Sequence, residues 1–399
     1  MPFRETSRLE ERIAMLADYD TGVFSVSELC RDYGVSRPAF YGWLARRDSG
    51  AADWFCDRSH APLSRPHRTP EAVCAAVLAV KRRFPRFGPK KVRAWLLRER
   101  PEGCWPAAST VGDILKRAGL VEPRGRRRPR ELGRVEVAAG APNAEWACDF
   151  KGWFRTRDGQ RCDPLTITDT ASRYLIEVRI AEPTIAGVRP VFERVFGECG
   201  LPAAIRCDNG PPFGSQGAAG LTELAVWWLK LGVRPRFIRP ASPQDNGRHE
   251  RMHRTLKADT ARPPSDSLSE QQARFDAFRQ HYNHVRPHEA LDQAPPASRW
   301  TPSARTIPPR LITPWYDPDW QVRQVRTSGE IKWKSQLVFV SQPLAGETVG
   351  LREREDGSHL VCFFDVPLGV LDRRGQFRRF APLRHRLRYA PEPQPQLDL

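Results

Sequence analysis

The sequence predicts a multidomain protein with an all-α N-terminal part, a mixed α/β centre and a small β-rich C-terminal part. Three observations support this division. Apolar residues recur at helical spacing over residues 8–118, β-type and helical runs alternate over residues 143–293, and short β-type runs separated by turn signals follow residue 319. With 399 residues, the chain has room for about two or three domains.

The composition indicates a polyanionic partner. The net charge is +17 and the pI is about 9.9, and no single tail carries the excess. The nine cysteines form no C-x-x-C pair, which favours a reducing compartment over a disulfide framework or a zinc ribbon. The first residues lack a secretory signal, and the longest apolar run, 72–80, is too short to span a bilayer. We therefore expect a cytoplasmic protein without a membrane partner.

Residues 1–50 have the pattern of a helix-turn-helix unit. Ser27 is expected to cap one helix, Gly34 permits the turn, and Ser36 is expected to cap a second helix. Arg37 and Tyr41, near the start of the second helix, are then the residues best placed to reach base edges of DNA. An ordinary helical hairpin is the alternative.

Residues 69–121 resemble a second helix-turn-helix unit, whose last helix is expected to open at Ser109 or Thr110 and to end at Gly119. Residues 122–142 form a basic linker. Four of its arginines are candidate phosphate contacts: Arg124, Arg126, Arg127 and Arg128. A solvated linker without a ligand is the alternative.

Three carboxylates in the α/β part are candidate metal ligands. Asp149 lies inside a strand-like run, Asp208 follows a short apolar run and precedes an Asn-Gly turn, and Glu250 begins a helical segment. Acidic residues at strand ends and in a helix's first turn commonly hold metal ions through their oxygens. A charge within a strand also requires a partner when it is buried.

The α/β part is predicted as three hairpin-connected strands followed by alternating helices and strands, the pattern of a mixed sheet. The expected strands cover 145–154, 161–168, 173–180, 203–207 and 234–238, and the expected helices cover 184–198, 221–231, 247–258 and 269–285.

Three linked motifs resemble those of the D,D,E recombinases, bacterial insertion-sequence transposases that share the retroviral integrase catalytic core. The motifs are Asp149, Asp208-Asn209-Gly210-Pro211-Pro212-Phe213, and Pro243-x-x-x-Gly247-x-x-Glu250-x6-Lys257. The resemblance implies a ribonuclease H-like core over residues 143–293, in which the first and fourth strands are neighbours. Two departures stand out: the chain lacks an N-terminal His/Cys zinc module, and residues 214–220 lengthen the segment between Asp208 and Glu250.

The resemblance also implies a reaction. Asp149, Asp208 and Glu250 would hold two Mg²⁺ (or Mn²⁺) ions, with Asp149 bridging them, for 3′-end cleavage and strand transfer. Their mutual repulsion without metal should raise their pKa values. The partners would be double-stranded DNA, as terminal inverted repeats and target, and further copies of the chain in a dimer or larger assembly. Asn209 and Lys257 would contact the DNA, Lys257 at the terminal phosphate. A bacterial cytoplasmic protein that joins the nucleoid when bound is expected.

Two other functions are alternatives to this one. His249-Glu250-Arg251-Met252-His253 matches H-E-x-x-H, the zinc-protease motif, but that reading leaves Asp149 and Asp208 unexplained, and we expect both histidines to face DNA or solvent. A catalytically silent, sequence-specific DNA-binding regulator is the second alternative. Asp169 is interpreted as a turn residue rather than a metal ligand, and Asp163 and Asp245 as loop acids.

Residues 319–390 are predicted to form a small β-barrel with a basic tail. Short β-type runs alternate with turns such as Asp356-Gly357, and arginines follow from Arg373 onward. The resemblance implies help in DNA binding, and a dimerisation module is the alternative.

Overall fold

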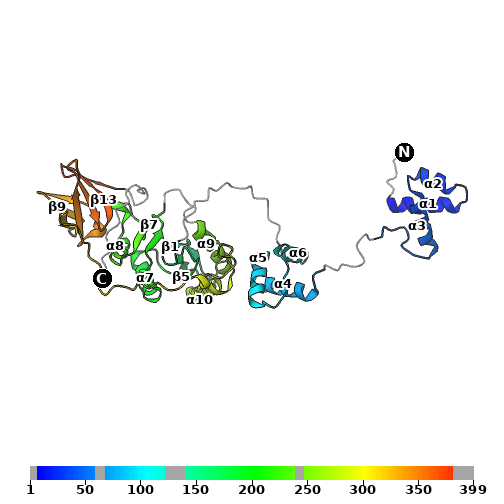
Figure 1. Ribbon diagram of the computed structural model, residues 1–399, viewed down its shortest axis with the longest axis horizontal. Coiled ribbons are helices and arrows are strands. Elements are labelled where there is room, and N and C mark those ends of the chain that lie inside the picture. The colour runs from blue at the N-terminus through cyan, green and yellow to red at the C-terminus, as the bar shows by residue number, and fades with distance from the viewer. Residues whose placement is uncertain (1–6, 59–67, 122–139, 239–246, 381–399) are drawn as a thin grey trace. The chain divides into compact units, whose positions relative to one another are not determined.

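A computed structural model describes residues 7–58, 68–121, 140–238 and 247–380 (Figure 1). The chain divides into two compact units, Met1–Pro70 and Glu71–Leu399. None of the helices in the described ranges has both the length and the apolarity that a membrane span requires. The finer domain boundaries expected from the sequence stay predictions.

The first unit consists of three helices: α1 (Arg8–Asp20), α2 (Val26–Asp32) and α3 (Arg37–Asp48). Gly34 takes a φ of +66° in the turn between α2 and α3, as predicted. The expected cap at Ser27 is wrong. Ser25 caps α2 instead, because its hydroxyl accepts from the Glu28 amide while the Glu28 carboxylate accepts from the Ser25 amide, a capping box. Ser36 does occupy the N-cap of α3, without a side-chain bond.

The second helical group is α4 (Glu71–Arg83), α5 (Pro89–Glu99) and α6 (Ala108–Arg117). Gly119 ends it at a φ of +67°, as predicted. The expected cap at Ser109 or Thr110 is wrong, because the helix already begins at Ala108 and both residues lie inside its first turn. A compact apolar core holds the three helices together: Val77, Val80, Phe87, Val92, Leu96, Val111, Ile114 and Leu115.

The central sheet has the order β5-β4-β1-β6-β7, in which β1 pairs antiparallel with β4 and parallel with β6. The predicted neighbourhood of the first and fourth predicted strands is confirmed. The strands are β1 (Glu145–Phe150), β4 (Pro164–Asp169), β5 (Leu175–Ile180), β6 (Ala204–Cys207) and β7 (Arg234–Phe237). A mixed sheet is what the sequence pattern predicted, and this strand order agrees with the one that the resemblance implies.

The predicted strands 145–154 and 161–168 are each broken in the structure. Gly152 turns the chain at a φ of +82° after β1 ends. The next residues form β2 (Phe154–Arg155), which pairs with β3 (Arg161–Cys162) in a separate hairpin. The remaining predicted strands agree with the structure to within two residues at each end.

Helices cover both faces of the sheet (Figure 1). On one face, α7 (Ile185–Cys199) and α8 (Glu223–Lys230) pack over Trp146 and Ile167 in the largest apolar cluster. On the other face, α9 (Gly247–Thr260) and α10 (Leu268–Gln280) contribute Met252 and Phe275 to a second cluster. The described short helical turns are η1 (Ala218–Gly220), η3 (His281–Val285), η4 (Glu289–Leu291), η5 (Pro296–Arg299) and η6 (Gln342–Leu344).

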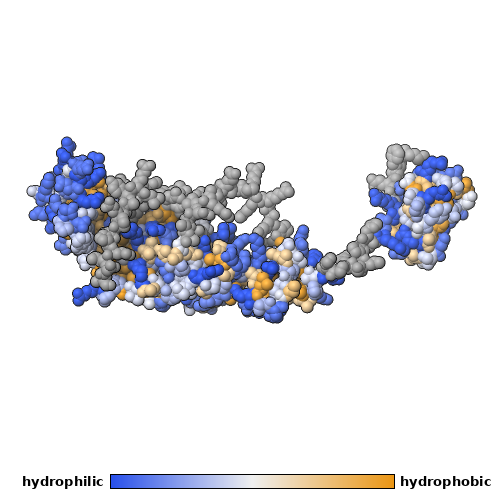
Figure 2. Space-filling view, in the orientation of Figure 1, coloured by the Kyte–Doolittle hydropathy of each residue, from blue (hydrophilic) through white to orange (hydrophobic). Residues whose placement is uncertain are grey.

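The C-terminal module is an antiparallel sheet of order β14-β13-β12-β11-β8 with a separate hairpin, β10-β9. Among the described strands no pairing closes this sheet, so the barrel stays a prediction. Figure 2 shows mostly hydrophilic residues on the visible face of the module. Its strands are β8 (Gln321–Gln324), β9 (Glu330–Trp333), β10 (Gln336–Phe339), β11 (Thr348–Glu353), β12 (His359–Phe363), β13 (Val366–Leu371) and β14 (Phe377–Arg379).

The extra segment 214–220 contributes to the attachment of this module. Buried Ala218 and Ala219 lie in the same apolar cluster as the inner residues of the C-terminal sheet. A Lys230–Glu347 ion pair of 2.6 Å joins α8 to the module as well. The lengthened segment between Asp208 and Glu250 is therefore part of a docking surface.

Candidate active site

Sheet register places the first two carboxylates opposite each other. Glu145 on β1 pairs with Ala204 on β6, an offset of 59 residues (204 − 145), and the offset between Asp149 and Asp208 is the same 59 (208 − 149). Because β1 and β6 are parallel, their carboxyl ends meet at one edge of the sheet. Extending the register therefore sets Asp208, just beyond β6, beside Asp149.

Glu250 reaches this edge from α9. It is exposed in the first turn of the helix, whereas Met252 and Leu256 are buried against the sheet. Burial, with smaller contributions from the charges of Asp208 and Glu250, raises the pKa of Asp149 to about 7. Burial likewise raises the pKa of Asp208. The predicted rise is thus confirmed for both aspartates, although burial and not repulsion is its main cause. The structure brings all three carboxylates together.

The donor atoms at this edge fit a hard divalent cation. The side chain of Asp149 is 22% exposed, so it is not fully closed off from solvent. Within the described ranges, Oδ1 of Asp208 and Oδ1 of Asn209 are buried without a hydrogen-bond partner. Buried acceptors without donors are destabilising, and a cation would satisfy them. Asn209 itself is fixed by donation from Nδ2 to the Ile238 carbonyl at 3.0 Å.

The expectation that His249 and His253 face DNA or solvent is wrong. They are only 3% and 5% exposed, because α9 packs this face on β4. In β4, Leu165 and Ile167 join the cluster under α7 and α8, so the alternating residues Thr166 and Thr168 face α9. Nε2 of each histidine lies 2.7 Å from Oγ1 of Thr166, and Nδ1 of His249 lies 3.0 Å from Oγ1 of Thr168.

This arrangement does not form a zinc-protease site. Both ring nitrogens of His249 are engaged by threonine hydroxyls, which leaves this histidine no lone pair for a metal. Asp149, His249 and His253 each offer one ligand atom within 4.8 Å of the others, and Asp149 was the only one of the three that sequence reasoning had selected as a ligand.

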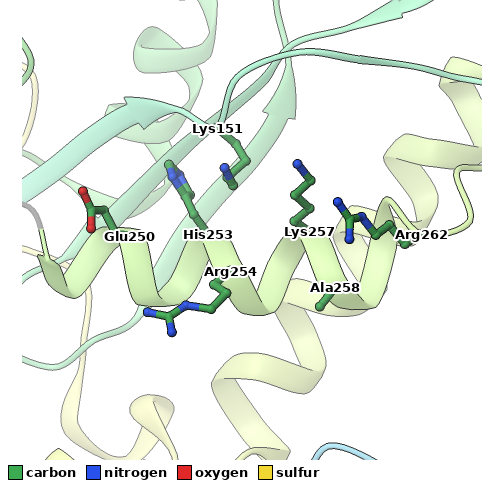
Figure 3. A pocket seen from close by; sticks show the side chains of 7 residues that line it. All are labelled: Lys151, Glu250, His253, Arg254, Lys257, Ala258 and Arg262. Carbon is green, nitrogen blue, oxygen red and sulfur yellow. The ribbon is translucent and has the colours of Figure 1, made fainter. Parts of the chain in front are cut away.

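An open groove of about 480 Å³ runs beside Glu250 (Figure 3). In Figure 3, Lys151, Lys257 and Arg262 extend toward the same side of α9 as Glu250 and His253, whereas Arg254 points away from them. The seven lining residues are Lys151, Glu250, His253, Arg254, Lys257, Ala258 and Arg262. Lys257 therefore lies where the sequence placed it, on the face of Glu250. Lys151 and Arg262 are additional cations of the groove.

The other candidates lie elsewhere. Arg37 and Tyr41 are exposed on α3 of the first unit. Arg124, Arg126, Arg127, Arg128 and the loop acid Asp245 lie outside the described residues. Asp169 is confirmed as a turn residue, since its Oδ2 accepts from the amide and hydroxyl of Ser172 at 2.7 and 2.6 Å. Asp163, between β3 and β4, pairs with Arg161.

Comparison with known proteins agrees with this geometry. Two family models, both described as integrase core domain, match residues 139–243 and 231–296. An uncharacterized 39.2 kDa protein of insertion element IS476 from Xanthomonas euvesicatoria is 25% identical over 273 residues, which cover 67% of this chain and 70% of that protein. An uncharacterized 31.7 kDa protein of insertion element IS407 from Burkholderia multivorans is 27% identical over 239 residues, covering 59% and 82% respectively.

Among solved structures, the HTLV-2 integrase catalytic core domain in complex with magnesium is 16% identical, with a TM-score of 0.32; the match covers 40% of this chain and 97% of that one.

The integrase core matches and the insertion-element relatives define an enzyme class. The protein is a DNA transposase or integrase, which acts on DNA by polynucleotidyl transfer. Within that class, the chain carries an integrase core domain over residues 139–296 and is similar to proteins of bacterial insertion elements.

Proposed function

We propose that this transposase binds the terminal inverted repeats of a mobile element, cleaves the 3′ ends and transfers them into target DNA. The observation that carries the proposal is the shared offset of 59 residues, which brings Asp149 and Asp208 to one sheet edge beneath Glu250. The raised pKa of Asp149 supports the same proposal, because the charges of Asp208 and Glu250 add to the effect of burial and must therefore lie near Asp149.

Asp149, Asp208 and Glu250 would together hold two Mg²⁺ or Mn²⁺ ions. When bound, the ions supply activation of a water or 3′-hydroxyl nucleophile and stabilisation of charge on the leaving oxygen. Asn209 shapes the loop after Asp208 through its bond to Ile238 and would contact the DNA there. The carboxylates would hold the ions at the reacting phosphodiester, and the basic side chains of the groove would bind the DNA strand.

Lys257 would hold the terminal phosphate, and Lys151 and Arg262 extend the same basic groove. Arg37 and Tyr41 would reach base edges from α3, and Arg124, Arg126, Arg127 and Arg128 would follow the phosphate backbone. Because two element ends must be joined in one event, the active species would be a dimer or larger, in the bacterial cytoplasm and on the nucleoid. The C-terminal module would add DNA contacts.

A strand-transfer assay with labelled element ends tests the proposal. Asp149→Asn, Asp208→Asn and Glu250→Gln should each abolish joining, while binding to the terminal repeats persists. Glu193→Gln is a matched control, because Glu193 is an exposed carboxylate on α7 that pairs with Arg189. Joining that survives Asp149→Asn contradicts the metal assignment. Repeat binding by a wild-type protein that never joins ends would favour the silent regulator.

A further inference from the structure

The hydroxyl of Thr166 has more partners than one hydrogen can serve. Its Oγ1 lies 3.0 Å from the carbonyl oxygen of Asp149 and 2.7 Å from Nε2 of both His249 and His253. A carbonyl oxygen can only accept, so the single hydroxyl hydrogen is donated to Asp149. The two lone pairs of Oγ1 then accept from the histidines, and each Nε2 carries a hydrogen.

This assignment fixes the tautomer of each ring. Both rings are almost fully buried, at 3% and 5% exposed, and burial favours the neutral imidazole over the charged form. A neutral imidazole with hydrogen on Nε2 has a lone pair on Nδ1. In His249 that lone pair accepts from Thr168 at 3.0 Å. In His253, Nδ1 faces Oδ2 of Asp149 at 4.0 Å.

A distance of 4.0 Å between Nδ1 and Oδ2 is too long for a hydrogen bond but suits two ligands of one ion. Bonds from a divalent ion to nitrogen and oxygen are about 2.0–2.2 Å, so two ligands can lie up to about 4.2 Å apart. His253 also lines the groove that holds Glu250, so its buried ring borders the space where the ion would lie.

We propose that His253 Nδ1 is an additional ligand, beside Asp149, of a divalent ion in the active site, and that Thr166 presents it by fixing its tautomer. The inference rests on the proposed metal site and adds a nitrogen donor to its oxygen ligands. Imidazole suits transition-metal ions, whereas Mg²⁺ takes oxygen ligands. The site therefore prefers Mn²⁺ to Mg²⁺ by more than an all-carboxylate site would.

Electron paramagnetic resonance of Mn²⁺ bound to the full chain tests this directly. Electron spin echo modulation should reveal coupling of the Mn²⁺ spin to a directly bound ¹⁴N nucleus in the wild-type protein. His253→Gln should abolish the coupling and weaken Mn²⁺ binding at least about tenfold, while Mg²⁺ binding changes much less. His288→Gln is the matched control, because His288 is a histidine with a lowered pKa that packs on Tyr282 away from Asp149.

The outcomes separate the two proposals. Bound Mn²⁺ without nitrogen coupling in the wild-type protein overturns the inference and leaves the three carboxylates untouched. Coupling that survives His253→Gln also overturns it. Nitrogen coupling in a wild-type protein that cannot join DNA ends leaves the inference standing and contradicts the proposed function. The wild-type spectrum requires no substitution, so a His253 variant that fails to fold does not prevent the decision.

Discussion

Thr166 faces Asp149 across the β1–β4 pair and donates its hydroxyl hydrogen to the carbonyl oxygen of Asp149 at 3.0 Å. The hydroxyl oxygen of Thr166, Oγ1, also accepts hydrogen bonds from two histidines of α9, His249 and His253. One side chain thus joins the strand that carries the first carboxylate to the helix that carries Glu250. The relative position of Asp149 and Glu250 depends on this contact, since residues of both elements share one buried hydroxyl.

Thr166→Val tests the importance of this hydroxyl. Valine has a similar shape but accepts no hydrogen bond, so two buried imidazole N–H groups lose their partner. We expect the free energy of unfolding to fall by about 2–4 kcal/mol, since each unsatisfied buried group is destabilising by about 1–3 kcal/mol. Urea denaturation measures the change. Thr166→Ser keeps the hydroxyl and should recover most of the stability, and a Thr166→Val protein as stable as wild type would contradict the hydrogen-bond assignment.

Asp149→Asn should stabilise the metal-free protein while it abolishes joining. Because the folded-state pKa of about 7 lies above the ordinary 3.8, the folded protein binds the extra proton between these values. Stability is therefore lost as pH rises through this window. At pH 8, replacement of the carboxylate should raise the free energy of unfolding by about 3–4 kcal/mol, and the gain should shrink toward pH 4.

Denaturation of both proteins at pH 8 and pH 5 in chelator checks this expectation, with Glu193→Gln as a control that should change stability by less than about 0.5 kcal/mol. Added Mn²⁺ should raise the melting temperature of the wild type more than that of the variant, because the ion binds only the folded state with its carboxylates. Equal stability of variant and wild type in chelator would mean that Asp149 is not held in an unfavourable environment.

The positions of the carboxylates could be predicted because each one lies next to a local sequence pattern that indicates a particular structure. A strand end, an Asn-Gly turn and a helix start are each encoded within a few residues around Asp208 and Glu250. The histidines were misplaced although a signal was present. His249, Met252, His253 and Leu256 follow the spacing of one helical stripe, and Met252 and Leu256 mark that stripe as the buried face. The motif H-E-x-x-H covers the same residues, and its spacing alone does not distinguish a buried stripe from a metal site.

The role of segment 214–220 could not be predicted from local sequence. Its buried alanines contact residues of the C-terminal module more than a hundred positions later, and small residues in a Gly-rich stretch otherwise indicate a loop. The two helix caps failed for a different reason. Several residues near the start of each helix have side chains that can cap it. In α2, Ser25 forms a capping box with Glu28 and takes the N-cap position that was expected for Ser27. Tertiary contacts and local competition thus set the limits of the prediction.

His249 should contribute to the loss of folding stability at acidic pH. Its folded-state pKa of about 3 lies below the ordinary 6.5, so the unfolded chain binds the extra proton between these values. Stability is therefore present above pH 6.5 and is lost as pH falls, by about 1.4 kcal/mol per pH unit for this residue. Urea denaturation from pH 7.5 to 4.5 should give a shallower acid dependence for His249→Gln than for wild type. Parallel curves would exclude this contribution.

Lys257→Ala should weaken DNA binding without an effect on the fold. Lys257 lines the groove beside Glu250, and loss of one phosphate contact should reduce the slope of log K against log salt by about 0.9. Fluorescence anisotropy with labelled element ends at several salt concentrations measures the slope. Lys257→Arg should retain it. Arg189→Ala removes one charge from α7, on the other face of the sheet. An equal reduction of the salt-dependence slope in Arg189→Ala would show that DNA binding depends only on the net charge of the protein.

Ala219 should determine whether the C-terminal module stays attached. It is buried in the apolar cluster shared with that module, and its amide donates to the Phe380 carbonyl at 3.2 Å. Asp at this position would bury an unpaired charge, which is destabilising by several kcal/mol, about 3 or more. Because Ile312 is bonded to Lys230 at the end of α8, detachment should also free the connection around Arg310. We expect trypsin to cleave Ala219→Asp there at least tenfold faster than wild type.

Ala219→Gly is the control. It keeps the close approach and suits the φ of +54°, so it should resist cleavage like wild type. Equal cleavage of all three proteins would mean that the apolar contact does not hold the module.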